Sequence, residues 1–186
     1  MTKFVNTRKH FTRIEVDRMI AVTRGHRNAA RDGCLLLLMF RHGLRVSEAC
    51  SLKTSQVDIE GQTLRVERMK KGLSTVHPLR AEEVQAVKAW LIERKRMNPQ
   101  TDTLFVSERL SQLNRRTVWA AIKQYGELAR LQIKAHPHML RHACGYELAN
   151  QGADAKQIQD YLGHRNIQYT AEYTAPQPTK FEKFWL

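Results

Sequence analysis

Apolar residues recur at helical spacing along most of the chain, in segments that glycine and proline residues separate. The first expected helix covers residues 12–23 and begins at a capping box, in which Thr12 is followed three residues later by Glu15. The second covers residues 28–42, is apolar along most of its length and ends at Gly43. We therefore place the second helix in the core.

The pattern changes between residues 57 and 79, where short runs alternate between apolar and polar positions. Such runs are typical of strands, so we expect two or three small antiparallel strands joined by tight turns. The segment Lys70-Lys71-Gly72 falls at one of these turns. A further strand-like run covers residues 103–106.

Helical periodicity fills most of the remaining chain. A short helix is expected to open at Ser47, and further helices cover residues 81–97, 115–128, 138–150, 154–162 and 167–174. With 186 residues the chain is long enough to bury one good core. The expected fold is therefore mainly α with a small antiparallel sheet, an α+β domain in a single compact unit.

Charge is the most informative part of the composition. Lys and Arg number 31 against 18 Asp and Glu, which gives a net charge of +13 and a pI near 10.1. Such an excess favours a polyanionic partner, most simply nucleic acid, although a basic protein without such a partner remains the alternative. The longest apolar run, residues 34–40, is far shorter than the roughly 20 residues of a membrane span. We expect a cytoplasmic protein with no membrane partner.

The three cysteines, Cys34, Cys50 and Cys144, are widely separated and show no spacing typical of a metal site. They are best interpreted as small buried hydrophobic residues in a reducing compartment. We assign them no chemistry.

The segment HPHMLRH, residues 136–142, carries the first candidate chemistry. His138 and Arg141 are neighbours on one helical face, and His142 lies one turn from His138. A His-x-x-x-His pair can bind a metal, but Met139 stands where the usual metal hydrolase motif has a glutamate. An imidazole and a guanidinium at a helix start suit a phosphate better, and this interpretation requires a second cationic group elsewhere.

Arg45, in the segment HGLRVSEAC, is the candidate for that second cation. It follows a glycine that ends a helix and lies between two apolar residues, which is unusual for a solvated charge. An ion pair with Glu48 is the structural alternative. Further along, Tyr169 and Tyr173 lie one helical turn apart, and spacing alone does not separate a packed aromatic from a reactive one.

Three segments, HGLRVSEA, HPHMLRHACGYELANQG and YLGHRNIQYTAEYT, occur in this order with a lysine-bearing hairpin between the first two. Together they look like the catalytic domain of the tyrosine recombinases, also called the phage integrase family. The resemblance covers about residues 12–174. The segments KKGLSTVHPL and KAHPHMLRH, together with the short length of the chain, most resemble the small bacterial recombinases that invert the promoter element of fimbrial operons.

The resemblance implies a role for six residues. Arg45 and Arg141 correspond to the two arginines that clamp the scissile phosphate, His138 and His164 to the two histidines, and Tyr173, nine residues after His164, to the nucleophile. His138 is the plausible base for the phenol, whose ordinary pKa is near 10. Tyr169 is then a packing or DNA-facing aromatic.

The lysine of the hairpin turn corresponds to Lys71, because Gly72 follows it. This sequence departs from the usual Gly-Lys-Gly, since Lys70 replaces the first glycine, and Lys70 remains an alternative. The lysine is expected to protonate the departing 5′ oxygen, which leaves a covalent 3′-phosphotyrosine and conserves the bond energy for rejoining. No metal, ATP or other cofactor is required by this chemistry.

The expected organisation is a basic arm at residues 1–11, a catalytic domain at 12–175 and a tail at 176–186. Larger members of the family carry an N-terminal domain that closes around DNA, and here Lys3, Arg8 and Lys9 are expected to supply phosphate contacts instead. The apolar end of the tail, Phe181 to Leu186, either docks on an adjacent protomer, as in family tetramers, or caps its own core.

The resemblance implies double-stranded DNA with inverted repeats as the partner, a homotetramer on synapsed DNA, DNA-bending accessory proteins and a nucleoid-associated location. The leading hypothesis is an enzyme that inverts DNA and so controls fimbrial expression, or phase variation. The alternatives are a strand-relaxing enzyme of the type IB topoisomerase kind and a DNA-binding regulator that has lost catalysis. Against the regulator, every expected catalytic residue type is present.

Overall fold

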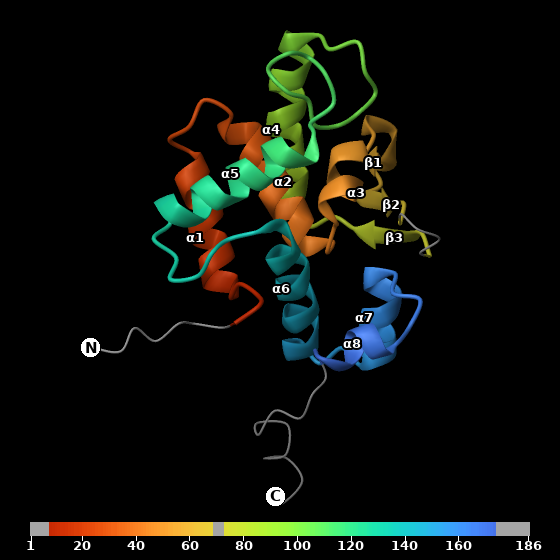
Figure 1. Ribbon diagram of the computed structural model, residues 1–186. Helices are drawn as coiled ribbons and strands as arrows, with labels where there is room; N and C mark the ends of the chain where they lie inside the picture. The colour runs from red at the N-terminus through yellow and green to blue at the C-terminus, as the bar shows by residue number, and fades with distance from the viewer. Residues whose placement is uncertain (1–7, 69–72, 174–186) are drawn as a thin grey trace, which may run out of the picture.

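A computed structural model of the chain describes residues 8–68 and 73–173 (Figure 1). The expected α+β fold is confirmed. The helices are α1 Arg13–Thr23, α2 Ala29–Arg41, α3 Val46–Ser51, α4 Ala81–Met97, α5 Arg115–Leu128, α6 Pro137–Asn150, α7 Ala155–Leu162 and α8 Gln168–Ala171, with a 3-10 turn at Thr54–Gln56. The strands are β1 Val57–Asp58, β2 Thr63–Val66 and β3 Thr75–Pro78, paired antiparallel in the order β1-β2-β3.

The expected boundaries hold to within a few residues, with one wrong element. Residues 103–106 do not form a strand, because they make only two isolated bridges, Lys53 with Thr103 and Val106 with Gln112. Their apolar side chains fill the core instead, and Leu104, Phe105 and Val106 are fully buried. The Leu104 carbonyl accepts a hydrogen bond from the Trp90 indole at 2.8 Å, so a side chain satisfies part of this backbone.

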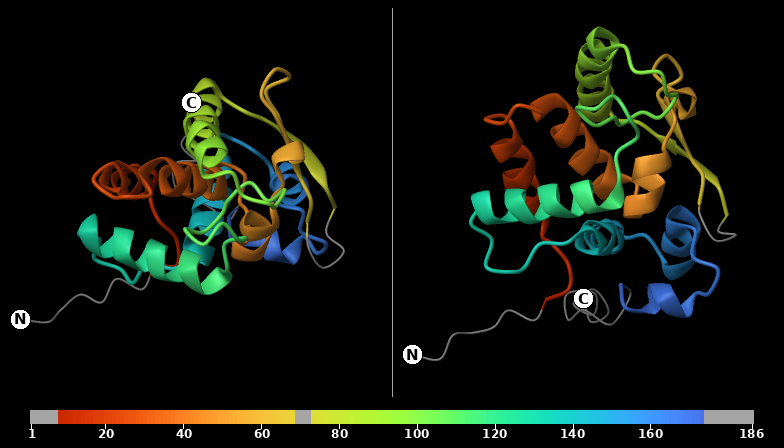
Figure 2. Two further views of the ribbon diagram at one scale, coloured as in Figure 1. Left: turned by 90° about the horizontal axis from the view of Figure 1, so that it is seen from above. Right: turned by 45° about the horizontal axis from the view of Figure 1, so that its top comes forward.

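Helix α2 lies at the centre of the main core, as its nearly continuous apolar sequence predicts. It packs against α1, α4 and α6 (Figures 1 and 2). Leu36, Leu38 and Met39 are each at most 1% exposed. Gly43, at φ +57°, ends this helix in the left-handed region, and a Cβ there would collide with the Leu162 side chain.

The C-terminal helices form a second, smaller core. Its buried members are Cys144, Ala149, Ile158, Leu162 and Tyr173. Helix α7 packs against α6, α8 packs against α7, and α7 also contacts β3 (Figure 1). The sequence around Tyr173 is thus held by packing that is largely separate from the main core.

Helix α1 begins at the predicted capping box, and contacts with this helix hold part of the expected basic arm. Thr12 accepts a hydrogen bond from the Glu15 amide, and the Glu15 carboxylate accepts one from the Thr12 amide. The same carboxylate lies 2.6 Å from the Arg8 guanidinium, while Phe11 is buried. Arg8 is therefore engaged by its own domain. Residues 1–7, with Lys3, lie outside the described residues.

The three cysteines are buried and unpaired in disulfides, as expected. Burial raises the pKa of all three thiols, to about 11 for Cys50 and about 12 for Cys144. Across the part of the chain that the structure describes, no helix is long and apolar enough to cross a membrane.

A buried chain of polar contacts joins β3 to α2 and α4. His77 Nε2 lies 2.7 Å from the Thr75 hydroxyl, His77 Nδ1 lies 3.1 Å from His42 Nδ1, and His42 Nε2 lies 2.7 Å from Glu83. Burial, together with the nearby His42 and Arg68, lowers the pKa of His77 to about 3. His77 is consequently neutral in the folded protein over the physiological range.

This pKa makes the stability of the fold depend on pH. Because the folded-state pKa of His77 lies below the unfolded value near 6.5, its contribution is complete above pH 6.5 and is lost as the pH falls toward 3. We expect the free energy of unfolding to drop between pH 7 and pH 4.5, and His77→Gln to remove roughly 2 to 3 kcal/mol of that drop. Urea titrations at both pH values, with His26→Gln as the control for loss of an imidazole elsewhere, test this; an unchanged drop in His77→Gln contradicts it.

Candidate active site

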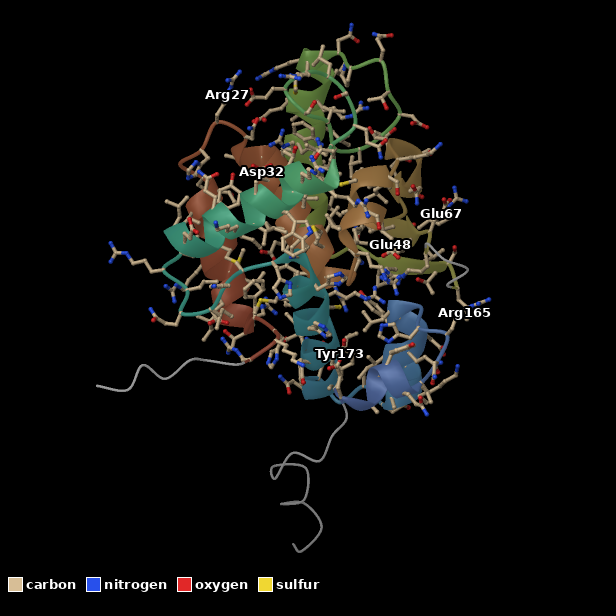
Figure 3. All side chains as sticks on the ribbon, viewed as in Figure 1. Arg27, Asp32, Glu48, Glu67, Arg165 and Tyr173 are labelled. Carbon is tan, nitrogen blue, oxygen red and sulfur yellow. The ribbon has the colours of Figure 1, made fainter. Side chains whose placement is uncertain are left out.

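Five of the six residues expected at the site line one open pocket of about 470 Å³. Arg45 reaches it from the start of α3, His138 and Arg141 from α6, His164 from the loop after α7, and Tyr173 from just beyond α8. The pocket lies between elements distant in sequence, and Figure 3 labels one of its lining residues, Tyr173, together with Glu48, the ion-pair partner of Arg45. Lys71 and its alternative Lys70 lie outside the described residues.

Arg45 stands at the residue before α3, where it makes the ion pair with Glu48 that was the structural alternative for this residue. Its Nη1 lies 2.7 Å from Glu48 Oε1, and its backbone amide donates to Glu48 Oε2 at 2.9 Å. Glu48 is buried, which by itself raises its pKa, but the hydrogen bonds from Arg45 and the charge of Arg68 hold that pKa below its ordinary value. The ion pair orients Arg45 and leaves its side chain 31% exposed toward the pocket.

Arg141 is a buried cation held by backbone carbonyls. Its guanidinium donates to the carbonyl of Gly43 and, at 2.7 Å, to that of Leu162. Burial, and then the charges of Arg45 and Arg68, lower its pKa to about 9. Repulsion between neighbouring cations therefore costs free energy, and an anion bound among them relieves it.

The two histidines, His138 and His164, differ in their positions and in the causes that lower their pKa values. His138 lies in the first turn of α6, and burial followed by the charges of His142 and Arg141 lowers its pKa. His164 follows Gly163, whose φ of +69° ends α7, and its Nδ1 lies 3.0 Å from the Thr170 hydroxyl. Burial, then Arg141 and Arg45, lower the pKa of His164 to about 4, so it is a neutral hydrogen-bonding group at pH 7.

The structure separates the two tyrosines. Tyr169 is 67% exposed, whereas Tyr173 is 2% exposed and packs on α6. A Cβ at Gly145 would lie 2.7 to 2.8 Å from the Tyr173 ring, so the glycine makes room for it. Tyr146 meets the same ring edge to face at 5.2 Å between centroids. Burial, and then the Glu172 carboxylate, raise the pKa of Tyr173.

His142 has a role that the sequence reasoning did not assign. The sequence offers it only as half of a metal-binding pair, whereas its Nδ1 lies 2.9 Å from the Tyr173 hydroxyl and 3.2 Å from Glu172. A base must lie within hydrogen-bonding reach of the proton that it takes, and here His142 does so. The signal that points to it is its position three residues before Gly145, which places both on the α6 face that receives Tyr173.

The arrangement suits the binding of an oxyanion and an attack on it by a phenol. Two guanidinium groups can bind phosphate oxygens in a bidentate manner, and the imidazoles supply further hydrogen bonds. Groups of three or more His, Cys, Asp or Glu side chains that could hold a metal do not occur among the described residues.

Comparisons with known proteins show what the chain as a whole is similar to. Residues 9–180 match the profile of the phage integrase family. The chain is 44% identical to the type 1 fimbriae regulatory protein FimE of Escherichia coli K12 over 97% of its own length and 92% of that protein, and 42% identical to FimB of the same strain over 97% and 91%. The crystal structure of XerA recombinase superposes with a TM-score of 0.82 at 28% identity, covering 95% of this chain and 63% of that one.

The contact between Glu172 and Tyr173 leads to a direct test of the electrostatics. Since the carboxylate raises the pKa of the phenol, Glu172→Gln is expected to lower the pKa of Tyr173. Titration of protein labelled with ¹³C at tyrosine Cζ, with the Tyr173 signal assigned through Tyr173→Phe, measures this. Glu147→Gln removes an acidic charge from α6 outside the pocket and should leave the Tyr173 titration unchanged. Equal titration curves in Glu172→Gln and the unmodified protein contradict the argument.

Proposed function

The chain belongs to the phage integrase family, and we propose that it is a site-specific DNA recombinase that cuts and rejoins DNA through a tyrosine nucleophile. The observation that carries this proposal is the meeting of Arg45, Arg141, His138, His164 and Tyr173 around one pocket. All five come from a single chain. The proposal therefore assigns the nucleophile and the phosphate clamp to the same subunit.

The substrate is double-stranded DNA. The net charge of +13 supplies the electrostatic attraction that such a polyanion requires. Two relatives that match over nearly the whole chain, FimE and FimB, are type 1 fimbriae regulatory proteins. The recombinase accordingly inverts a promoter element between inverted repeats and thereby controls fimbrial expression.

In the proposed cleavage step the Tyr173 oxygen attacks the scissile phosphorus, and the bond from phosphorus to the 5′ oxygen breaks. Arg45 and Arg141 bind the nonbridging oxygens, and His138 and His164 donate hydrogen bonds to them, which stabilises the charge that develops in the transition state. The proton of the phenol passes to a base, for which His142 is in reach at 2.9 Å and His138 remains the sequence-based candidate.

The products are a 3′-phosphotyrosine and a free 5′ hydroxyl, which needs a proton. Lys71, or Lys70 beside it, is the proposed donor; both residues lie outside the described part of the chain. Because the phosphodiester bond energy is kept in the tyrosine ester, attack by another 5′ hydroxyl rejoins the strands without ATP. No cofactor or metal enters either step.

Further parts of the proposal concern assembly. This chemistry needs one copy of the protein for each strand that is cut. Two synapsed duplexes have four such strands, so we propose a homotetramer on DNA. DNA-bending accessory proteins and a place in the nucleoid belong to the same proposal. Of the expected basic arm, Lys9 is exposed and suited to a phosphate contact, whereas Arg8 already binds Glu15.

The nucleophile is tested by Tyr173→Phe, with Tyr169→Phe as the matched control one helical turn away. Incubation with a supercoiled plasmid carrying the DNA that flanks this gene should give a covalent protein–DNA adduct with the unmodified chain and with Tyr169→Phe. Tyr173→Phe should give none while still binding the plasmid. Adduct formation by Tyr173→Phe would falsify the assignment, and DNA binding without any adduct or inversion in the unmodified chain would favour a regulator that has lost catalysis.

The tail, residues 176–186, lies outside the described residues, and its exchange between protomers is a proposal from the sequence. Deletion of residues 181–186 is expected to abolish the tetrameric complex on DNA while binding to a single site persists. Native gel analysis of synaptic complexes measures this. Unchanged synapsis and cleavage would refute exchange, and a fall in melting temperature of the free protein with synapsis intact would show that the tail caps its own core.

A further inference from the structure

Arg68 is a buried guanidinium immediately behind the pocket. It follows β2, and its side chain is fully inaccessible to solvent. Its two terminal nitrogens reach four acceptors: Glu48 Oε2 at 3.0 Å, the Gly43 carbonyl at 3.3 Å, the His42 carbonyl at 3.0 Å and the Tyr161 carbonyl at 2.7 Å. Burying a charge costs much free energy unless the group is paired and hydrogen-bonded, and these four contacts offset that cost.

The first of these partners connects Arg68 to Arg45. The Glu48 carboxylate accepts from Arg45 through Oε1, and its Oε2 is shared by the Arg45 amide and Arg68. The carboxylate plane sets the direction in which the Arg45 guanidinium points into the pocket, because a bidentate acceptor fixes the geometry of its donors. Arg68 in turn donates a hydrogen bond to Oε2 of that carboxylate and so holds it in place.

The backbone partners connect Arg68 to Arg141. Both guanidinium groups donate to the Gly43 carbonyl. They also donate hydrogen bonds to adjacent carbonyls at the end of α7, Arg68 to that of Tyr161 and Arg141 to that of Leu162. The two arginines therefore hold the same two pieces of backbone, the turn after α2 and the end of α7.

Arg68 itself is not placed to bind substrate. Its side chain has no exposed surface, and it is not among the residues that line the pocket. Burial lowers its pKa, while the charge of Glu48 opposes that change. Its effect on the site consequently passes through the two residues that it holds.

We propose that Arg68 is the positioning residue that aligns both phosphate-binding arginines, Arg45 through Glu48 and Arg141 through the Gly43 carbonyl. Phosphoryl transfer depends chiefly on alignment and charge stabilisation, so a small displacement of either guanidinium lowers the rate of cleavage more than the affinity for DNA. A lysine at this position keeps the charge near Glu48, but its single ammonium group cannot span the carboxylate and the three carbonyls. The inference rests on the proposed recombinase function.

Arg68→Lys is the decisive variant, and Arg31→Lys is its matched control. Arg31 is also a buried arginine, bonded to the Asp32 carboxylate at 2.8 Å and to the Val106 carbonyl at 3.2 Å, but it lies outside the pocket. Both substitutions remove a buried guanidinium held by a carboxylate and by backbone. Only the first should disturb the clamp.

First-order cleavage is measured at saturating DNA on a substrate nicked so that cleavage is irreversible, well below the unfolding temperature of each variant. Arg68→Lys should cleave about 10- to 100-fold more slowly than the unmodified chain, with DNA affinity within about threefold. Arg31→Lys should lose stability but cleave at close to the unmodified rate. Circular dichroism shows whether Arg68→Lys is folded. If it is not, Glu48→Gln replaces it, because the amide removes the charge and one of the two acceptor oxygens through which Arg68 and Arg45 are connected.

A double-substitution cycle separates alignment from general damage. If Arg68 acts through Arg45, the loss of cleavage rate in the double variant Arg45→Lys/Arg68→Lys should be well below the product of the losses in the two single variants. Each of three results would overturn the proposal. They are a double-variant loss equal to the product of the single losses, a normal cleavage rate in folded Arg68→Lys, and a rate loss in Arg31→Lys equal to that in Arg68→Lys. No adduct with the unmodified chain would instead overturn the recombinase function, so the two failures are distinguishable.

Discussion

Mutual repulsion among closely spaced cations, two of them buried, is the constraint on which this site depends. The charges of Arg45 and Arg68 lower the pKa of Arg141, the charge of Arg45 lowers that of Arg68, and burial removes the water that would screen Arg68 and Arg141. Carbonyls at the ends of α2 and α7, and the carboxylate of Glu48, offset that repulsion. The left-handed turn at Gly43 serves this purpose directly, because it turns one carbonyl toward two guanidinium groups.

The same constraint explains why the site is made from so many elements. A single helix cannot surround an anion with convergent cations, since residues on one face point the same way. Here α3 brings Arg45, α6 brings Arg141, and the loop after α7 brings His164. The two cores hold different parts of the site, since the larger fixes the arginine after α2 and the smaller fixes the tyrosine. Glycines at positions 43, 145 and 163 let these parts approach closely.

The sequence allowed the fold class, the helices and the five pocket residues to be predicted, because capping signals, apolar periodicity and ordered motifs are all local in the chain. It did not reveal Arg68, whose partners come from three other elements, or the contact of His142 with Tyr173. Both depend on which side chains meet after folding. The sequence wrongly predicts a strand at residues 103–106, because a short apolar run fits a strand and a core-filling loop equally well.

The burial of Tyr173 in a small core of its own has a consequence for the energy landscape of the protein. Local opening of a structure costs less free energy where fewer apolar groups are packed, and the C-terminal core has far fewer than the core around α2. Tyr173 is therefore held by packing that costs less free energy to open than the packing around Arg45. An excited state in which this smaller core has opened would keep Arg45 in place on the main core while Tyr173 moved away from it.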